Sequence, residues 1–201
     1  MRRTTIRVAA GLAATVLAAA PAAAQHRGHA HGEHAMMPTS GLRAELIRDI
    51  EQLERKYLAL ADAMTGKYDW RPGGGVRSVS EVFMHVVGSN FMIPTFAGIQ
   101  PQDEYRAANP QEAMAKARAL EEITDEAKVK EALGHAFMHA RHAVAAISDE
   151  QLDDVVKVFG QDATKRNVLT LLVAHMHEHL GQAIAYARIN GVVPPWSAGE
   201  S

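Results

Sequence analysis

The 201-residue sequence contains no cysteine. This absence excludes disulfide bonds, thiolate nucleophiles, sulfur ligands for a metal, and the lipid-modified cysteine of a bacterial lipoprotein. Any metal site in this chain must therefore use nitrogen and oxygen ligands.

The sequence also lacks an apolar run of the ~20 residues that a membrane-spanning helix needs. Its most apolar stretch, residues 8–20, follows a head with three arginines and precedes the alanines at positions 22–24. This order is typical of a signal peptide, here residues 1–24, and an uncleaved anchor is the alternative. We expect the mature chain to start at Gln25, to be free of the membrane, and to be periplasmic or secreted.

An excess of positive charge is absent as well. Loss of the leader would leave 18 basic residues against 23 acidic ones, a formal charge of −5 with the histidines neutral. Nucleic acid, a polyanion, is therefore not an expected partner. We expect a small-molecule substrate of unknown identity, and the broad apolar faces of the helices described below are compatible with a homodimer.

Histidine is abundant directly after the leader. Residues 25–39 carry four histidines and two glycines but no apolar periodicity, so they are predicted to form a flexible arm. Short histidine-rich tracts can bind metals, and the alternative is an arm without this role. The histidines of the arm are His26, His29, His31 and His34.

Apolar residues at three- and four-residue steps predict helices along the rest of the chain. Ser and Thr residues precede these segments as potential caps, and glycine or proline follows them. The predicted helices span about residues 40–65, from Ser78 or Ser80 to about Pro94, 111–147 with a break near Thr124, and 165–190. Because no segment alternates with a two-residue period between hairpin turns, we expect no sheet. The fold class is therefore an all-α, single-domain four-helix bundle over residues 40–197.

Helix geometry sorts the histidines of the last helix. Relative to Leu172 in its apolar stripe, His175 lies at roughly −60° and His179 at roughly −20°, so both point into or along the core. His177 lies at roughly +140° and Glu178 at roughly −120°, so neither joins the pair. Burying two imidazoles one turn apart is costly without a partner. Metal is one such partner, and buried acids or water are the alternative.

The remaining histidines are harder to place. His85 lies at roughly −60° from Val82, at the margin of the apolar stripe of its helix, so geometry alone leaves its direction open. His135, His139 and His142 share one face of the third helical region, opposite the apolar side. We predict that these three are exposed to solvent and without a dedicated function.

Two segments of this chain carry a recognisable pattern: residues 69–86 read DWRPGGGVRSVSEVFMHV, and residues 175–195 read HMHEHLGQAIAYARINGVVPP. Both resemble the DinB-like family of small bacterial helix-bundle metalloproteins. The first is similar to the tryptophan, loop and serine that lead into the family's first metal histidine. The second resembles its closing His-x-x-x-His-x-x-Gln helix and Gly-x-x-Pro-Pro ending. The four-helix layout with a long second crossover agrees, and the resemblance extends from about Leu42 to Trp196.

The resemblance implies a site in which His85, His175 and His179 hold one divalent metal ion, with zinc the first expectation and nickel the second. Members of the family bind such ions, most lack an assigned reaction, and some transfer low-molecular-weight thiols. Three imidazoles leave a coordination position open for a water molecule, as in catalytic zinc sites. Gln182 and Glu81 are candidates to orient a ligand or that water.

The expected function is metal-dependent hydrolysis of an unknown substrate, although the sequence does not decide whether the protein is an enzyme. Thiol transfer ranks below hydrolysis because the small thiols that it uses are cytosolic, whereas this chain is expected to be exported. Metal binding or storage without catalysis, with the arm as a capture segment, is the other alternative.

Overall fold

The computed structural model describes residues 37–197 and 199 of the chain. The predicted signal peptide and the histidines of the predicted arm lie outside these residues. The elements are α1 (Gly41–Ala63), α2 (Val79–Met92), η1 (Ile93–Ala97), α3 (Pro110–Leu120), α4 (Glu126–Ala146), η2 (Asp149–Gln151), β1 (Val155–Val158), β2 (Gln161–Thr164), α5 (Lys165–Ile189) and η3 (Pro195–Ser197). The predicted helices are confirmed, including the break that separates α3 from α4.

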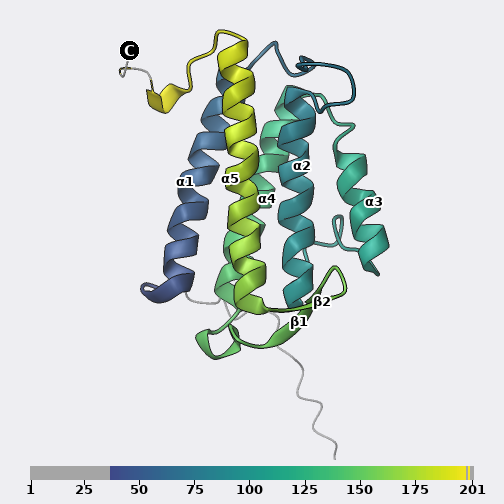
Figure 1. The fold of residues 1–201 in the computed structure, drawn as a ribbon, viewed down its shortest axis with the longest axis vertical. Helices are drawn as coiled ribbons and strands as arrows, with labels where there is room; N and C mark the ends of the chain where they lie inside the picture. The colour runs from purple at the N-terminus through teal and green to yellow at the C-terminus, as the bar shows by residue number, and fades with distance from the viewer. Residues whose placement is uncertain (1–36, 198, 200–201) are drawn as a thin grey trace, which may run out of the picture. The chain divides into compact units, whose positions relative to one another are not determined.

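Four of the helices form an all-α bundle. α1 packs against α4 and α5, and α2 packs against the same two helices. α1 and α5 run in one direction and α2 and α4 in the other, as the chain colours show (Figure 1). α3 belongs to the long crossover between α2 and α4, and it lies outside the four helices against α2 (Figure 1).

The start of α2 is set by a capping box. The Ser78 hydroxyl accepts a hydrogen bond from Glu81 N, and the Glu81 carboxylate accepts one from Ser78 N at 2.6 Å. This reciprocal pair satisfies two backbone donors that would otherwise lack partners at the helix end. Of the two serines that the sequence offers as caps, the structure uses Ser78. It thereby fixes the residue at which α2, the helix that carries His85, begins.

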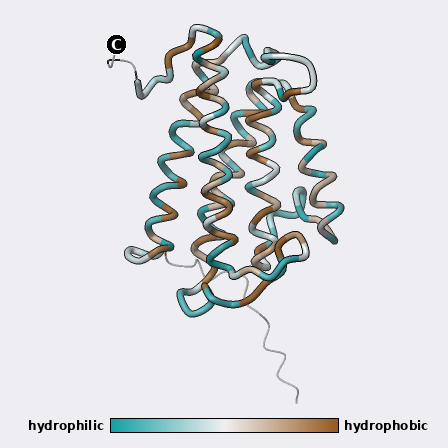
Figure 2. The backbone as a smooth tube through the Cα atoms, viewed as in Figure 1, coloured by the Kyte–Doolittle hydropathy of each residue, from teal (hydrophilic) through white to brown (hydrophobic). Residues whose placement is uncertain are grey.

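The core joins three of the bundle helices through aromatic rings. The Tyr57 ring of α1 lies 6.2 Å from that of Phe83 on α2 and 5.3 Å from that of Phe137 on α4. All three side chains are fully buried. Apolar and polar segments alternate along each helix (Figure 2), as expected for helices that are buried on one side.

The expectation that the chain contains no sheet is wrong. β1 and β2 pair antiparallel, with Val155 opposite Thr164 and Val158 opposite Gln161. Phe159 (φ 48°) and Gly160 (φ 82°) form the two-residue turn between them, and positive φ at both central residues is what a tight hairpin requires. Each strand has only four residues, and the turn lacks the Asn-Gly or Asp-Gly signal, so the sequence pattern was too short to reveal the hairpin.

The prediction that three histidines of α4 face solvent is correct only for His142. His139 is buried, its ring lies 5.6 Å from that of Phe91, and His135 is half-buried. α4 packs on both α1 and α2, so its covered surface is wider than its apolar stripe. Burial first, and the nearby His142 second, lower the pKa of His139 to about 4.

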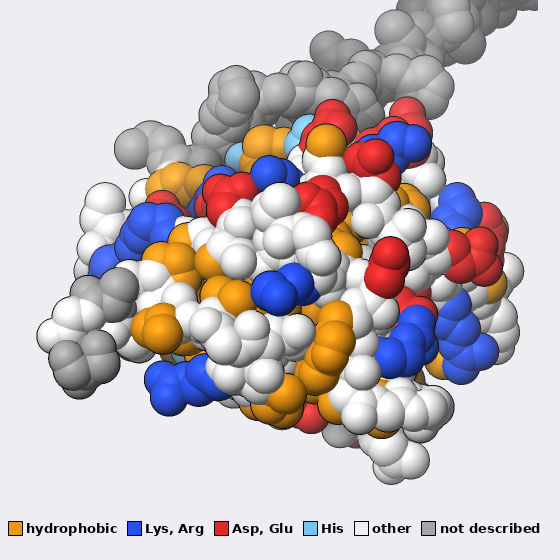
Figure 3. Space-filling model, turned by 90° about the horizontal axis from the view of Figure 1, so that it is seen from above, with side chains coloured by type: hydrophobic (Ala, Val, Ile, Leu, Met, Phe, Trp, Pro, Cys, Tyr) orange, Lys and Arg blue, Asp and Glu red, His pale blue; other side chains and the backbone are white. Residues whose placement is uncertain are grey.

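The end of the bundle where α2 begins and α5 ends carries acidic and basic side chains interspersed among apolar ones (Figure 3). Within the described part of the chain, no helix is both long enough and apolar enough to cross a membrane.

Candidate metal centre

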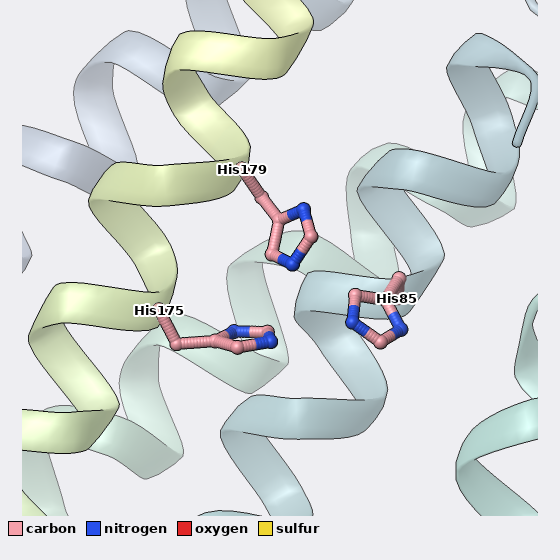
Figure 4. Close-up of side chains that lie close together, drawn as sticks. All are labelled: His85, His175 and His179. Carbon is pink, nitrogen blue, oxygen red and sulfur yellow. The ribbon is translucent and has the colours of Figure 1, made fainter.

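Three histidines from two helices converge between α2 and α5. The ring centroids lie 5.1 Å apart for His85 and His175, 4.6 Å for His85 and His179, and 4.4 Å for His175 and His179. One nitrogen of each ring lies within 4.8 Å of the others, and the rings point toward a common space (Figure 4). The structure thus brings together the three residues that the sequence singled out.

Continuous helix geometry produces this convergence. His175 and His179 are one turn apart in the middle of α5, which begins at Lys165 after its N-cap Thr164 and ends at Ile189. α2 is packed against α5 and presents His85 from the opposite side (Figure 4). Neither helix needs to unwind to bring the imidazoles together, so the site is built on rigid elements.

Two of the rings are held by a hydrogen bond at their outer nitrogen. His85 Nδ1 donates to Glu121 Oε1 at 2.8 Å, and His179 Nδ1 donates to Gln182 Oε1 at 2.8 Å. Gln182 Nε2 in turn donates to the Tyr186 hydroxyl at 3.0 Å. A proton on Nδ1 leaves the lone pair on Nε2, so both rings are held in a tautomer whose free nitrogen faces the shared space.

His175 is held less firmly than the other two. Its Nε2 lies 3.4 Å from the Ser89 hydroxyl, which is long for a hydrogen bond. Its Nδ1 is buried and has no hydrogen-bond partner among the residues that the structure describes. A buried imidazole whose nitrogens find little from the protein is costly, and a metal ion would supply a partner for one of the two.

The two proposed orienting residues have different positions. Gln182 is hydrogen-bonded to His179, as above. Glu81 is engaged elsewhere, because its carboxylate binds Ser78 N at 2.6 Å and Arg71 Nη2 at 3.0 Å. The carboxylate on His85 belongs to Glu121, which follows α3 and lies 36 residues further along the chain.

Electrostatics keeps two of the imidazoles neutral near pH 7. Burial is the largest cause that lowers the pKa of His85. Burial, followed by the neighbouring His179 and His85, lowers the pKa of His175 to about 3. For Glu121, burial opposes ionisation, but hydrogen bonds from Arg77 and His85 outweigh it and lower the pKa. Neutral imidazoles beside an ionised carboxylate are the protonation states that metal binding requires.

The geometry fits a metal ion. The ligand nitrogens of a tetrahedral zinc ion lie about 3.3 Å apart, given zinc–nitrogen bonds of ~2 Å. The three nitrogens lie within 4.8 Å of one another, so small rotations about the side-chain bonds would close the site. His177 stays outside it, exposed, with Nε2 3.0 Å from Asp49 Oδ2, as its angle on the helix predicted.

A model of the DinB superfamily matches residues 49–183, which is well over half of the chain and includes all three histidines. The chain belongs to the DinB superfamily. This confirms the resemblance read from the two sequence segments around His85 and His175.

The bundle is also similar to a solved DinB-like protein from Bacillus cereus ATCC 10987. The TM-score is 0.51 and the sequence identity 19%, over 75% of this chain and 93% of that chain. At this identity the likeness supports the DinB fold alone. No curated protein matches the chain.

Sequence reasoning missed three polar residues beside the three histidines. They are Glu121, the Arg77 that binds it at 2.8 Å, and Ser89 beside His175. Ser89 had a usable signal, because it is four residues after His85 and so shares its helix face. Glu121 had none, because its position depends on how α3 packs outside the bundle.

Cavity size does not identify the histidine site. A cavity of about 320 Å³ lies among residues of η1, α3 and the β1–β2 turn, including Phe96, Met114 and Phe159. It contains none of the three histidines, and its lining is mostly apolar. We therefore assign the candidate site from the chemistry of its donors.

Proposed function

We propose that this DinB protein is exported and holds one divalent metal ion with His85, His175 and His179. Zinc is the first candidate ion and nickel the second. The observation that carries the proposal is that three imidazole nitrogens from two rigid helices lie within 4.8 Å of one another. The outer-nitrogen hydrogen bonds of His85 and His179 support it, because they aim the free nitrogen of each ring inward.

We propose further that the ion serves hydrolysis of a small-molecule substrate. A divalent ion held by His85, His175 and His179 would supply Lewis-acid chemistry, which polarises a carbonyl or phosphoryl group and activates water. The chain's own part is to orient the ligands through Glu121 and Gln182. The His85 side chain is 24% exposed, so a substrate would approach the site from its side.

Hydrolysis ranks above the thiol transfer of some family members for two reasons. The predicted signal peptide would place the protein outside the compartment that contains small thiols, and the chain has no cysteine. Mass spectrometry of the protein purified from its own host would determine its N-terminal residue and so test export. A mature start at Gln25 is expected, and an intact leader would contradict it.

Elemental analysis of protein purified from its own host compartment tests the metal site. We expect about one equivalent of a divalent metal in the wild type and far less in His175→Ala. His177→Ala is the matched control, since His177 lies on the same helix but bonds to Asp49 at the surface. Equal metal contents in all three proteins would refute the site.

Turnover is tested with a panel of esters, amides and phosphoesters. Hydrolysis that is abolished by a chelator, restored by zinc, and lost in His175→Ala but not in His177→Ala supports the proposed reaction. Absence of turnover by metal-loaded protein across the panel would favour binding without catalysis.

Storage is a second candidate because four histidines lie within residues 26–34. Removal of residues 25–36 distinguishes the two functions. If most of the metal is lost, the arm is the main binding segment. If one equivalent of metal stays, the three-histidine site of the bundle is the main binding site. Retention of that equivalent together with turnover favours the enzyme.

A further inference from the structure

A helix outside the bundle supplies a residue to the histidine site. α3 packs against α2, and its C-cap residue is Glu121. The Glu121 carboxylate accepts a hydrogen bond from His85 Nδ1 at 2.8 Å, and its side chain is only 19% exposed. The crossover between α2 and α4 therefore reaches back to a residue in the middle of α2.

The same carboxylate is held from its other side. Arg77 Nε donates to Glu121 Oε2 at 2.8 Å, and Arg77 Nη2 donates to Oε1 at 3.1 Å. This two-point geometry fixes both the position and the plane of the carboxylate. Arg77 directly precedes Ser78, the N-cap of α2. One carboxylate thus joins the start of α2, the end of α3 and the imidazole of His85.

A close backbone approach sets where α3 lies. A Cβ atom added to Gly88 of α2 would come 2.8 Å from Ala117 Cβ and 2.9 Å from Ala117 Cα. Real Cβ atoms essentially never come this close, so only glycine at position 88 permits the observed spacing. Gly88 lies three residues after His85 and Ala117 four residues before Glu121. The contact therefore sets the spacing between α2 and α3, and with it how close the Glu121 carboxylate comes to His85.

We infer that Glu121 is a positioning residue for His85, carried to the site by the packing of α3 on Gly88 and held there by Arg77. The inference rests on the proposed metal site. By accepting a hydrogen bond from the Nδ1–H group, the carboxylate keeps the proton of His85 on Nδ1. The Nε2 lone pair stays free, and the imidazole becomes a more basic ligand for a metal. Because such linkage is reciprocal, metal binding stabilises the docking of α3, and the docking of α3 strengthens metal binding.

Zinc affinity tests the role of Glu121. The measurement is competition with a chromophoric chelator, using the full mature chain. Glu121→Gln keeps the size of the side chain but removes the charge, and we expect zinc to bind about 10- to 100-fold more weakly. Glu122→Gln is the matched control, because Glu122 is the next residue and is exposed. Its affinity is expected to equal that of the wild type.

Gly88→Ala tests the packing of α3 without changing any of the three hydrogen-bonded residues Arg77, Glu121 and His85. Zinc affinity is expected to fall in the same direction as in Glu121→Gln. Gly134→Ala is the control glycine, because a Cβ there meets nothing within 4 Å. Circular dichroism would show that both variants fold. If Gly88→Ala does not fold, hydrogen exchange on the wild type and Glu121→Gln carries the test.

Hydrogen exchange of the α3 amides measures the coupling directly. We expect zinc to slow exchange across residues 110–120 in the wild type, and to do so much less in Glu121→Gln. Equal zinc affinities of the wild type and Glu121→Gln, or α3 exchange that zinc leaves unchanged, would overturn the inference while the metal site stands. A wild type that binds no zinc would overturn both.

Discussion

The hydroxyl of Tyr57 on α1 donates a 2.7 Å hydrogen bond to the carbonyl oxygen of Met176 on α5, the residue that follows His175. Tyr57 is completely buried, and burial raises its pKa well above the usual value, so it stays a donor across the accessible pH range. The bond holds α5 against α1. It therefore helps to fix the helix from which two of the three histidines project.

Tyr57→Phe keeps the ring and removes only this hydrogen bond. We expect the free energy of unfolding to fall by about 1 kcal/mol, the net value of a typical internal hydrogen bond. Urea denaturation followed by circular dichroism measures the change. A loss of several kcal/mol would instead mean that the ring no longer packs against Phe83 and Phe137, and no loss would mean that the bond is immaterial.

His175→Leu is expected to increase the stability of the metal-free protein while abolishing metal binding. The wild-type ring has a buried Nδ1 without a partner in the described part of the chain. An unsatisfied buried polar atom costs about 1–3 kcal/mol, which an apolar side chain avoids. Denaturation in excess chelator at pH 7 provides the comparison. If the variant is less stable than the wild type there, the imidazole does not carry this cost.

Substitutions at Gln182 should change metal affinity in both directions. Gln182→Leu removes the acceptor of the 2.8 Å bond from His179 Nδ1, so we expect affinity to fall about tenfold. Gln182→Glu replaces the amide by a carboxylate, which accepts the same proton more strongly, so affinity should rise. Chelator competition at pH 7.5 measures both variants. Shifts of the same sign would contradict an orienting role for residue 182.

His139 should make the metal-free protein lose stability as the pH falls from about 6.5 to about 4. Its pKa is about 4 in the fold because of burial and the nearby His142, against 6.5 ordinarily. In this window the unfolded chain binds a proton that the folded chain does not, so protonation favours unfolding as the pH drops. The shift corresponds to roughly 3 kcal/mol.

Urea unfolding at several pH values, in chelator, tests this for the wild type and His139→Leu. The difference in stability between the two should change across the window, with the wild type losing more toward pH 4. The comparison is needed because His175 titrates in the same direction. Parallel pH profiles of the two proteins would show that His139 is not the group responsible.

The sequence alone determined the features that depend on neighbours within one helix. The helices, the two candidate capping serines of α2, and the inward pair His175 and His179 all follow from local spacing and capping chemistry. His177 was correctly placed away from this pair for the same reason. Two sequence segments also carried the resemblance to the DinB family, which the family model confirmed.

Only the tertiary structure decided the features that depend on contacts between helices. The direction of the His85 side chain depends on the packing of α2 against α5. His139 is buried because both α1 and α2 cover α4. Glu121 reaches His85 because Gly88 lets α3 approach α2 closely. Periodicity specifies the face of a helix, whereas a site built from several helices depends on the distance and rotation between them, which packing sets.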